Sequence, residues 1–421
     1  MSQPKSSSQT EEKAVPVWRD LLSGLIYGAG DDDPSAIGTY SQIGAKTGIS
    51  LLWLLLISTP MLASVQMTVA KFGAVTKKGL STVLREEYNL PIAIFAAALI
   101  CVANIATLGA DIAGTAQGMV LVCPVSWHVS WKWLPVPITL IIWALQVFGK
   151  YKLIKNILVA LSLILISYII AGIMAHPDWM HVIHDTFLPH IQFSLGYFTA
   201  AVGLLGATIS PYMFYFQEAE EVEEKAGVKD LKGIKLHTVA GMIFSNLVGY
   251  FVILSVSVAR AKHGGTLHID TAADAAAALK PFAGSAAKTV LGLGLIGSGL
   301  LAIPVLAAAT STMISELARW RVGMHHKPKR APQYYTILTI TMFAGILVLM
   351  LGINPIKALY WSQILSGVVA PVLLFLIFRL STRKSVLGNY TNAPRLQFWG
   401  WFTFVIMVVA VILMFVSWFK K

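Results

Sequence analysis

Three consecutive carboxylates lie inside the first apolar stretch of the chain. Asp31, Asp32 and Asp33 are followed at once by Pro34, in the run DDDPSAIG. A carboxylate inside a bilayer costs at least about 2.5 kcal/mol, and proline removes a backbone donor and breaks a helix. Such a segment should unwind where it lines a polar cavity. The sequence therefore predicts an ion or substrate site here, with Asp33, next to free backbone carbonyls, as the central ligand.

Each of the three aspartates also has an alternative role. Asp33 could form a structural ion pair with Lys46 or Lys288. At an unwound turn, neighbouring side chains point in different directions, so Asp32 could bind the ion or instead cap a helix or line the vestibule. The same two alternatives apply to Asp31.

Two later apolar segments carry polar groups that could face the same cavity. Asp111 lies in a segment that is otherwise free of charge, where it could relay protons or ions, or could hold helices together through Asn104 or Thr107. Gln363 and Ser362 supply neutral oxygens in the segment ALYWSQILSG. Ordinary hydrogen bonding between helices is the alternative for this pair.

Three other patterns have simpler structural explanations. The acidic run Glu218–Lys225 is more typical of a solvated face than of an inner gate that attracts cations. The glycine-rich run Leu291–Gly299 lacks the lysine of a phosphate-binding loop, so it indicates close helix packing. A metal-capturing role is disfavoured for a group of histidines in one loop, because no cysteine or carboxylate cage surrounds them; these are His176, His181, His184 and His190.

The composition is that of an integral membrane protein. Hydrophobic residues make up 56% of the 421 residues and charged residues only 12%, against about a quarter charged in soluble domains. The net charge of +12 comes from short basic clusters between apolar spans, so we expect no nucleic-acid partner and a lipid bilayer instead. Cys101 and Cys123 indicate neither a disulfide nor a metal site. Residues 1–16 are polar and predict a disordered cytosolic tail.

The fold class predicted is an all-α integral membrane domain over residues 17–421. About eleven segments are long and apolar enough to cross about 30 Å of hydrocarbon. Short basic clusters place the N-terminus in the cytoplasm and, with eleven spans, the C-terminus outside. The weakest segment is the fourth, so ten spans remain an alternative. The segments are 18–45, 50–74, 91–122, 134–149, 152–175, 194–217, 234–259, 286–317, 333–352, 356–379 and 397–418.

A second proline-broken segment mirrors the first. In LLGATISPYMFYFQ, Pro211 follows small residues and the hydroxyl of Ser210. Two broken segments, each opening a set of five spans, are typical of a five-plus-five inverted repeat of the LeuT-like kind. We expect residues 17–175 and 194–379 to form the two repeats, with a peripheral last helix at 395–418. The broken helices would meet at the bilayer midplane, where their free carbonyls can hold a cation.

The two broken segments together resemble the Nramp family of divalent-metal transporters. DDDPSAIGTYSQIG is similar to the family's DPGN signature, and GATISPYMFYF to its GATxMPH-like signature. The resemblance implies a transporter rather than an enzyme, with a divalent metal ion as substrate and no cofactor. It places the metal ligands at Asp33 and at the backbone carbonyl of Ala207. The site expected from the residues and the resemblance together comprises Asp33, Ala36, Ala207, Ser210, Gln363 and Asp32, with Asp111 as a candidate relay.

The departures from the family pattern point to a particular ion. Ala36 stands where the family has a ligating asparagine, and Ser210 where it has a ligating methionine. A thioether favours softer ions such as manganese and iron. A roomier site with oxygen ligands only suits magnesium, which keeps several waters. The pattern therefore resembles the Nramp-related magnesium transporters, which implies uptake of largely hydrated Mg²⁺, and also Mn²⁺, by alternating access.

Proton coupling is also affected by these departures. Tyr212 stands at the family's histidine position, and Gly114 at the glutamate that follows the aspartate equivalent to Asp111. The resemblance thus implies transport without protons. Two alternatives remain: a proton-coupled Mn²⁺ or Fe²⁺ importer that uses Asp111 and one acid of the triplet, and an amino-acid transporter of the same architecture. A membrane enzyme or electron-transfer subunit lacks support, because no zincin, serine-elbow or cysteine-cluster motif occurs.

Overall fold

The fold is described by a computed structural model that covers residue 28 and residues 30–124, 130–149, 163–223, 225–323 and 326–419. Over these residues it consists of helices and connecting segments without strands. The tail predicted at residues 1–16 and most of the first half of the segment 18–45 lie outside the described residues. So does the first part of the segment 152–175.

Most of the predicted spans appear as long helices. Nine helical segments in the described residues are long and apolar enough to cross a membrane, and a tenth candidate is bent by 113° between Leu163–Met174 and Trp179–Phe187. The count of eleven is therefore not confirmed. The α-helices are α2 (Pro34–Thr47), α3 (Leu52–Thr76), α4 (Leu80–Glu87), α5 (Leu90–Val122), α6 (Pro135–Phe148), α8 (Ile166–Met174), α9 (Trp179–Phe187), α10 (Leu195–Thr208), α11 (Pro211–Glu223), α12 (Leu231–Lys262), α13 (Ala272–Ala283), α14 (Ala287–Leu317), α15 (Pro332–Met350), α16 (Pro355–Leu380), α17 (Lys384–Leu387) and α18 (Pro394–Phe419).

Both predicted helix breaks are confirmed. Residues 28, 30 and 31 are helical, Asp32 and Asp33 are not, and α2 starts again at Pro34. In the same way α10 ends at Thr208 and α11 starts at Pro211, with Ile209 and Ser210 between them. Each proline is the first residue of its helix, where its missing N–H leaves no hydrogen bond unmade. The sequence thus both breaks the spans and restarts them.

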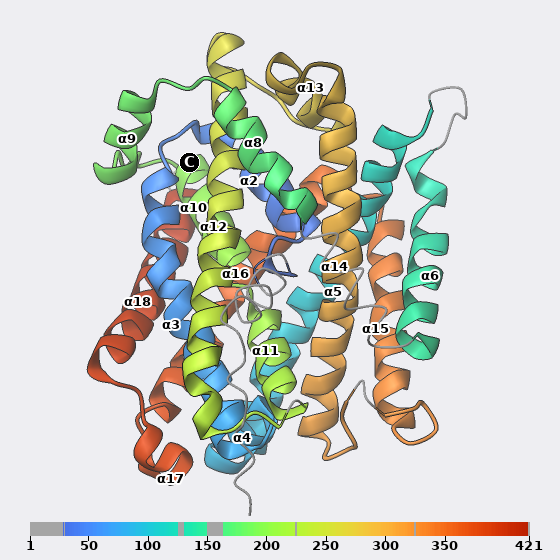
Figure 1. Cartoon of the computed structure of the whole chain (residues 1–421), viewed down its shortest axis with the longest axis vertical. Helices are drawn as coiled ribbons and strands as arrows, with labels where there is room; N and C mark the ends of the chain where they lie inside the picture. Colours follow the sequence, from blue (N-terminus) through green and yellow to red (C-terminus); the bar gives the residue numbers. More distant parts are fainter. Residues whose placement is uncertain are drawn as a thin grey trace, which may run out of the picture.

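Helix α2 lies at the centre of the molecule. It packs against α12, α16, α10 and α5, and Figure 1 shows it between these helices, with α10 in the same half of the molecule and α11 in the other half. Twelve of its fourteen residues are buried. The first break therefore lies in the middle of the bundle, where water and lipid are both excluded.

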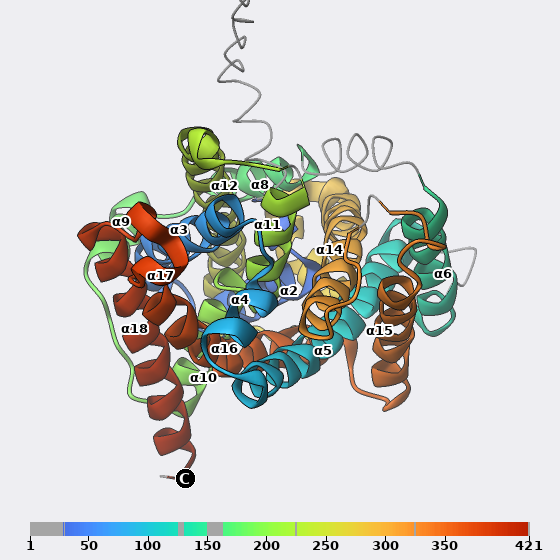
Figure 2. The ribbon, with the colours of Figure 1, turned by 90° about the horizontal axis from the view of Figure 1, so that it is seen from below.

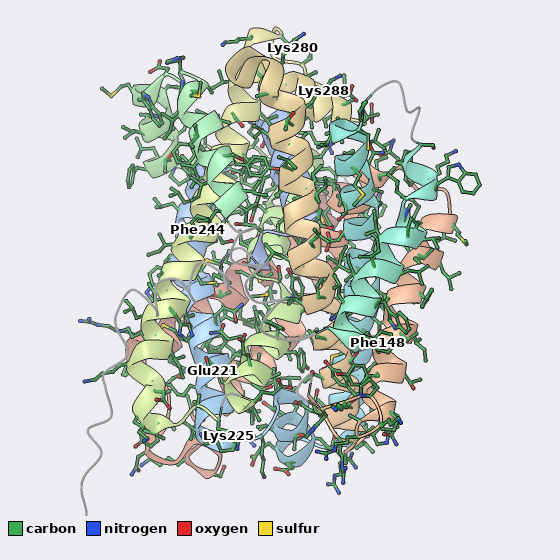
Figure 3. All side chains as sticks on the ribbon, turned by 45° about the vertical axis from the view of Figure 1, so that its right-hand side comes forward. Phe148, Glu221, Lys225, Phe244, Lys280 and Lys288 are labelled. Carbon is green, nitrogen blue, oxygen red and sulfur yellow. The ribbon has the colours of Figure 1, made fainter. Side chains whose placement is uncertain are left out.

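The outer helices present apolar side chains around this centre. Helices α18 and α6 lie at opposite margins of the bundle, as Figures 1 and 2 both show. Only 17% of the apolar window of α18 is buried, and Phe148 at the end of α6 is 74% exposed. Charged groups gather at the two ends instead: Figure 3 places Lys280 and Lys288 at one end and Lys225 at the other. An apolar belt between two charged ends is the surface that a bilayer requires.

Candidate ion-binding site

Asp33 is the best-connected of the carboxylates at the first break. It is the N-cap of α2, and its Oδ1 accepts a hydrogen bond of 2.5 Å from the backbone amide of Ala36. The side-chain amide of Gln363, on α16, lies 3.2 Å from Oδ1 and 3.3 Å from Oδ2. The Tyr212 hydroxyl, on α11, lies 3.2 Å from Oδ2. Asp33 thus joins three helices and is completely buried.

The ion-pair alternative for Asp33 finds no support in the described residues. None of their salt bridges includes an aspartate of the triplet. The Lys46 Nζ lies 4.0 Å from the centroid of the Tyr360 ring, and Lys288 is at the far end of α14 (Figure 3). The carboxylate of Asp33 is held by neutral donors, which a cation can replace or supplement.

The second break adjoins the first. The hydroxyl of Tyr212, two residues after Ser210, also lies 3.2 Å from the backbone oxygen of Gly30. Ser210 is 1% exposed, and its Oγ lies 3.4 Å from the carbonyl oxygens of both Gly206 and Ala207 at the end of α10. Backbone oxygens at the end of α10 carry partial negative charge. A hydroxyl and a row of carbonyls therefore lie next to the Asp33 break.

Close packing between α10 and α16 positions Gln363. A Cβ added to Gly206 would overlap the backbone of Gln363 and Gly367, and one added to Gly367 would overlap the backbone of Val202. The two glycines therefore allow the helix backbones to approach each other closely. This approach carries Gln363 to Asp33, and the Gln363 Oε1 is buried without a hydrogen-bond partner. That oxygen is available to a cation.

Asp111 faces the first break, but through a partner that the sequence did not indicate. Its Oδ1 accepts hydrogen bonds from the Ser35 backbone amide at 2.9 Å and from the Ser35 hydroxyl at 2.5 Å. Asn104 bonds to Thr310 instead, and the Thr107 hydroxyl has no partner. Asp111 therefore forms a hydrogen bond with neither Asn104 nor Thr107, the two partners expected from the sequence. Asp111 caps the first turn of α2 together with Asp33.

Gly114 leaves no room for a side chain beside Asp111. A Cβ at Gly114 would lie 2.8 Å from the Pro34 Cβ and 3.1 Å from the Leu359 Cδ2. Both distances are shorter than the roughly 3.5–4.0 Å of carbon atoms in contact. The packing of α5 against the break therefore depends on glycine at this position, and a carboxylate side chain cannot be accommodated without movement.

Asp32 and Asp31 have neighbours that Asp33 lacks. The Asp32 Oδ1 accepts a hydrogen bond of 3.1 Å from the Ser245 hydroxyl, on α12. Asp31 is completely buried, and neither of its carboxylate oxygens has a hydrogen-bond partner. The hydroxyls of Ser210 and Ser245 lie near it. Asp33 thus contacts α16 and α11, Asp32 contacts α12, and Asp31 lies near Ser245 of α12 and Ser210 of the second break.

The structure brings together some of the predicted residues and not others. Asp33 and Gln363 are in contact, and the Ser210 break adjoins them. Ala36 contributes its backbone amide to Asp33, and its methyl group offers no ligand atom. The Ser362 hydroxyl donates to the Leu359 carbonyl of its own helix at 2.9 Å, which agrees with the structural alternative for this residue. Among the described residues no group of three or more histidines, cysteines and acids is arranged to hold a metal ion.

Three functional contacts were not predicted from the sequence. The motif comparison identifies Tyr212 only as the residue at the family's histidine position, and no motif contains Ser35 or Ser245 as a ligand. Tyr212 and Ser35 each follow the proline of a break, and this spacing could have indicated them. Ser245 is one hydroxyl in an apolar helix, and only the packing of α12 against the break distinguishes it.

The expectation of a solvated face for the run Glu218–Lys225 is wrong for its first half. Glu218 is completely buried and Glu221 is 3% exposed. The reason is that α11, the second half of a broken span, packs between α3 and α14. The expectation of close helix packing at Leu291–Gly299 is supported, because a Cβ at Gly292 would lie 2.8 Å from the Gly118 backbone oxygen on α5.

Comparison with known proteins agrees with this geometry. The family described as natural resistance-associated macrophage protein-like, or Nramp, matches residues 24–417. A manganese transporter of Eremococcus coleocola, in complex with an aromatic bis-isothiourea compound, has a similar structure, with a TM-score of 0.75 and 16% identity over 94% of this chain and 87% of that one. Mhp1, a nucleobase-cation-symport-1 family transporter, matches with a TM-score of 0.60 and 10% identity over 94% and 92% of the two chains. A Na⁺-coupled sialic acid symporter matches with a TM-score of 0.57 and 11% identity over 94% and 95%.

Proposed function

Because the chain belongs to the Nramp family, whose members transport divalent metal ions and are not enzymes, we propose that its main substrate is Mg²⁺, with Mn²⁺ as a second substrate. The ion crosses largely hydrated, by alternating access and without proton coupling. As in the rest of the family, the metal ion is the substrate and not a cofactor. The chain is a multi-pass membrane protein.

The single observation that carries the choice of Mg²⁺ is the absence of sulfur from the ligand groups at the two breaks. The groups available are the Asp33 carboxylate, the Gln363 Oε1, the Ser210 hydroxyl and the Ala207 carbonyl. All four are hard oxygen donors, which suit Mg²⁺. A thioether at the position of Ser210 would favour Mn²⁺ or Fe²⁺ instead. Nothing in this donor set discriminates against a hard ion that keeps water ligands.

Two positions support transport without protons. Gly114 is enclosed by Pro34 and Leu359, so no acidic side chain follows Asp111 on that face of α5. Tyr212 replaces an imidazole with a phenol, whose ordinary pKa of about 10 keeps it protonated at neutral pH. A proton-coupled Mn²⁺ importer remains the second candidate, because Asp111 is a fully buried acid within one turn of the ion site. An amino-acid substrate is disfavoured, since three aspartates would repel its carboxylate.

The closed site is compatible with alternating access. Asp33 and Ser210 are at most 1% exposed, so a hydrated ion enters only when the helices around the breaks separate. We place the two moving units in residues 17–175 and 194–379, with α18 outside them. The peripheral position of α18 supports that division (Figure 2).

The N-terminus is proposed to be cytoplasmic and the C-terminus extracellular. Helices α4 and α17, which contain Arg85 and Lys384, lie at one end of the molecule (Figure 1), and Lys225 lies at the same end (Figure 3). Clustered basic residues favour the cytoplasmic side. Helix α18 starts at this end and runs to the other.

Uptake into proteoliposomes tests the proposal. Mg²⁺ and Mn²⁺ entry and internal pH are measured together, for the parent and for Asp33→Asn. We expect Mg²⁺ uptake without acidification. A carboxylate attracts a +2 ion about 4 Å away, through one water, by about 2 kcal/mol even at the dielectric constant of water, so the variant should lose about 30-fold in ion affinity or more. Asp185→Asn, at the exposed helix α9, is the matched control and should transport normally.

Two results would contradict the proposal. Acidification of the liposomes in step with metal entry would favour the proton-coupled importer. Normal Mg²⁺ flux in Asp33→Asn would remove the central ligand from the mechanism.

A further inference from the structure

Four buried carboxyl groups surround the first break, and their compensation is unequal. Asp33 and Asp111 both accept backbone amides from the first turn of α2, at the positive end of that helix dipole. Each also accepts side-chain donors, from Gln363 and from Ser35. These two carboxylates are therefore stabilised by the protein itself. No salt bridge of the described residues reaches any of the four.

Asp31 and Asp32 lack this stabilisation. Asp31 is the last helical residue before the break and Asp32 follows it, and neither accepts a backbone amide from the first turn of α2. The Asp32 Oδ1 accepts one hydrogen bond, from Ser245, while the Asp32 Oδ2 and both oxygens of Asp31 have no hydrogen-bond partner. The hydroxyls of Ser245 and Ser210 lie near Asp31 without bonding to it. Both residues have no exposed surface. Two uncompensated carboxylates in a dry interior strongly favour a bound cation.

A third oxygen faces the same region. The Tyr40 side chain is completely buried and its hydroxyl has no hydrogen-bond partner. A Cβ at Gly249 would lie 2.8 Å from the Tyr40 Cζ, and Gly249 is one helical turn after Ser245 on α12. The charges of all three aspartates of the triplet act on the Tyr40 hydroxyl, that of Asp32 most strongly. Buried hydroxyl groups normally have a hydrogen-bond partner or contact an ion or a water. The free hydroxyl of Tyr40 therefore needs such a ligand.

Helix α12 is fixed against this part of the break. A Cβ at Gly28 would overlap the backbone of Gly241, so the segment that ends at Asp31 touches α12 directly. Ser245 is one turn after Gly241. Close contact between the two backbones therefore fixes the position of Ser245 at the break.

We propose that Asp31, Asp32, Ser245 and Tyr40 form a second site, for a hard divalent cation, on the α12 side of the first break. Its ligands are two carboxylates and two hydroxyls, all hard oxygen donors. Charge balance favours a divalent ion, because two divalent ions, one here and one at Asp33, neutralise the four carboxylates. This charge count rests on the proposed function, in which Asp33 also holds a divalent ion, whether Mg²⁺ or Mn²⁺.

Counting bound Mn²⁺ tests this site. Electron paramagnetic resonance measures free Mn²⁺ during titration of the purified full chain in lipid nanodiscs. We expect two Mn²⁺ per parent chain, one for Asp32→Asn combined with Ser245→Ala, one for Asp33→Asn, and none when all three substitutions are combined. Two Mn²⁺ ions this close also broaden each other's spectrum, and each single-site variant should lose that broadening. Asp32→Glu keeps the carboxylate and should retain two ions.

Ser257→Ala is the control for folding and handling. Ser257 is also on α12, and its hydroxyl donates only to the Ile253 carbonyl of the same helix, so this variant should bind two ions. One Mn²⁺ in the parent, or two in Asp32→Asn with Ser245→Ala, would overturn the second site and indicate that Asp31 and Asp32 hold protons. If Asp32→Asn combined with Ser245→Ala loses one ion and Asp33→Asn loses none, the proposed transport site is contradicted and the second site is supported.

Discussion

Substitution of Gly114 by alanine tests whether packing of α5 controls the ion site. The added Cβ would lie 2.8 Å from the Pro34 Cβ and 3.1 Å from the Leu359 Cδ2. Carbon atoms in contact are about 3.5 Å apart or more, so Pro34 must move by about 0.7 Å or α5 must withdraw. Pro34 follows Asp33 directly, and the movement therefore reaches the carboxylate.

The expected magnitude has two parts. Overpacking of a dense core costs about 1–3 kcal/mol of stability. Binding geometry is held within about 0.5 Å, and a misplacement of about 1 Å can cost about 100-fold in activity. For a shift of about 0.7 Å we expect metal uptake to fall by about 10-fold or more. The assay is Mg²⁺ uptake into proteoliposomes, normalised to the amount of folded protein, with thermal unfolding measured in parallel.

Gly118→Ala is the matched control, one turn further along α5. Its Cβ would lie 2.8 Å from the Gly292 oxygen and 2.8 Å from the Leu295 Cβ. The overlap is as severe as at Gly114, but it presses on α14 and not on the break. We expect similar destabilisation in the two variants and a large loss of uptake in Gly114→Ala alone. Equal uptake in the two variants would refute the reasoning.

Three further substitutions at the breaks have defined outcomes. Ser210→Met introduces a thioether, so the ratio of Mn²⁺ to Mg²⁺ uptake should rise, by about 10-fold for a preference of about 1.4 kcal/mol; an unchanged ratio in competitive uptake would argue against Ser210 as a selectivity residue. Tyr212→Phe removes the hydroxyl 3.2 Å from Asp33, and ion affinity measured by equilibrium dialysis should change while the pH of the liposome interior stays constant during uptake. Ser35→Ala removes a 2.5 Å hydrogen bond to Asp111 and should lower the free energy of unfolding by about 1.5–3 kcal/mol. An unchanged free energy of unfolding would contradict this prediction and indicate that the bond forms only in some states.

The helix breaks could be predicted because they depend on local chemistry. Pro34 and Pro211 each remove a backbone donor, and the carboxylates before Pro34 add the cost of charge in lipid. Proline alone does not end a span, because Pro60, Pro304 and Pro371 lie inside α3, α14 and α16. The apolar composition and the basic clusters likewise fix a membrane fold whatever the packing. Asp33 followed from a carboxylate before a proline in an apolar span, the family resemblance added Ala207 from its motif position, and the helix of Gln363 was expected to lie beside the two breaks.

The buried face of α11 could not be predicted in this way. A run with Glu218 and Glu221 has the composition of a solvated surface, and these side chains are buried because α3 and α14 pack against them. The number of spans has the same limitation. Hydropathy counts apolar residues and does not report a bend, and the 113° bend between α8 and α9 falls at His176, whose φ is 51°, and Pro177.

The sequence by itself determined that two apolar spans break, that acids lie at the first break and that sulfur is missing from the second. Those properties reside in covalent structure and in the cost of charge in lipid. Only the tertiary structure decided which partner each acid has: Gln363 and Tyr212 for Asp33, Ser35 for Asp111 and Ser245 for Asp32. The reason is that adjacent side chains at an unwound turn point toward different helices, and the packing of those helices depends on glycines far away in the chain.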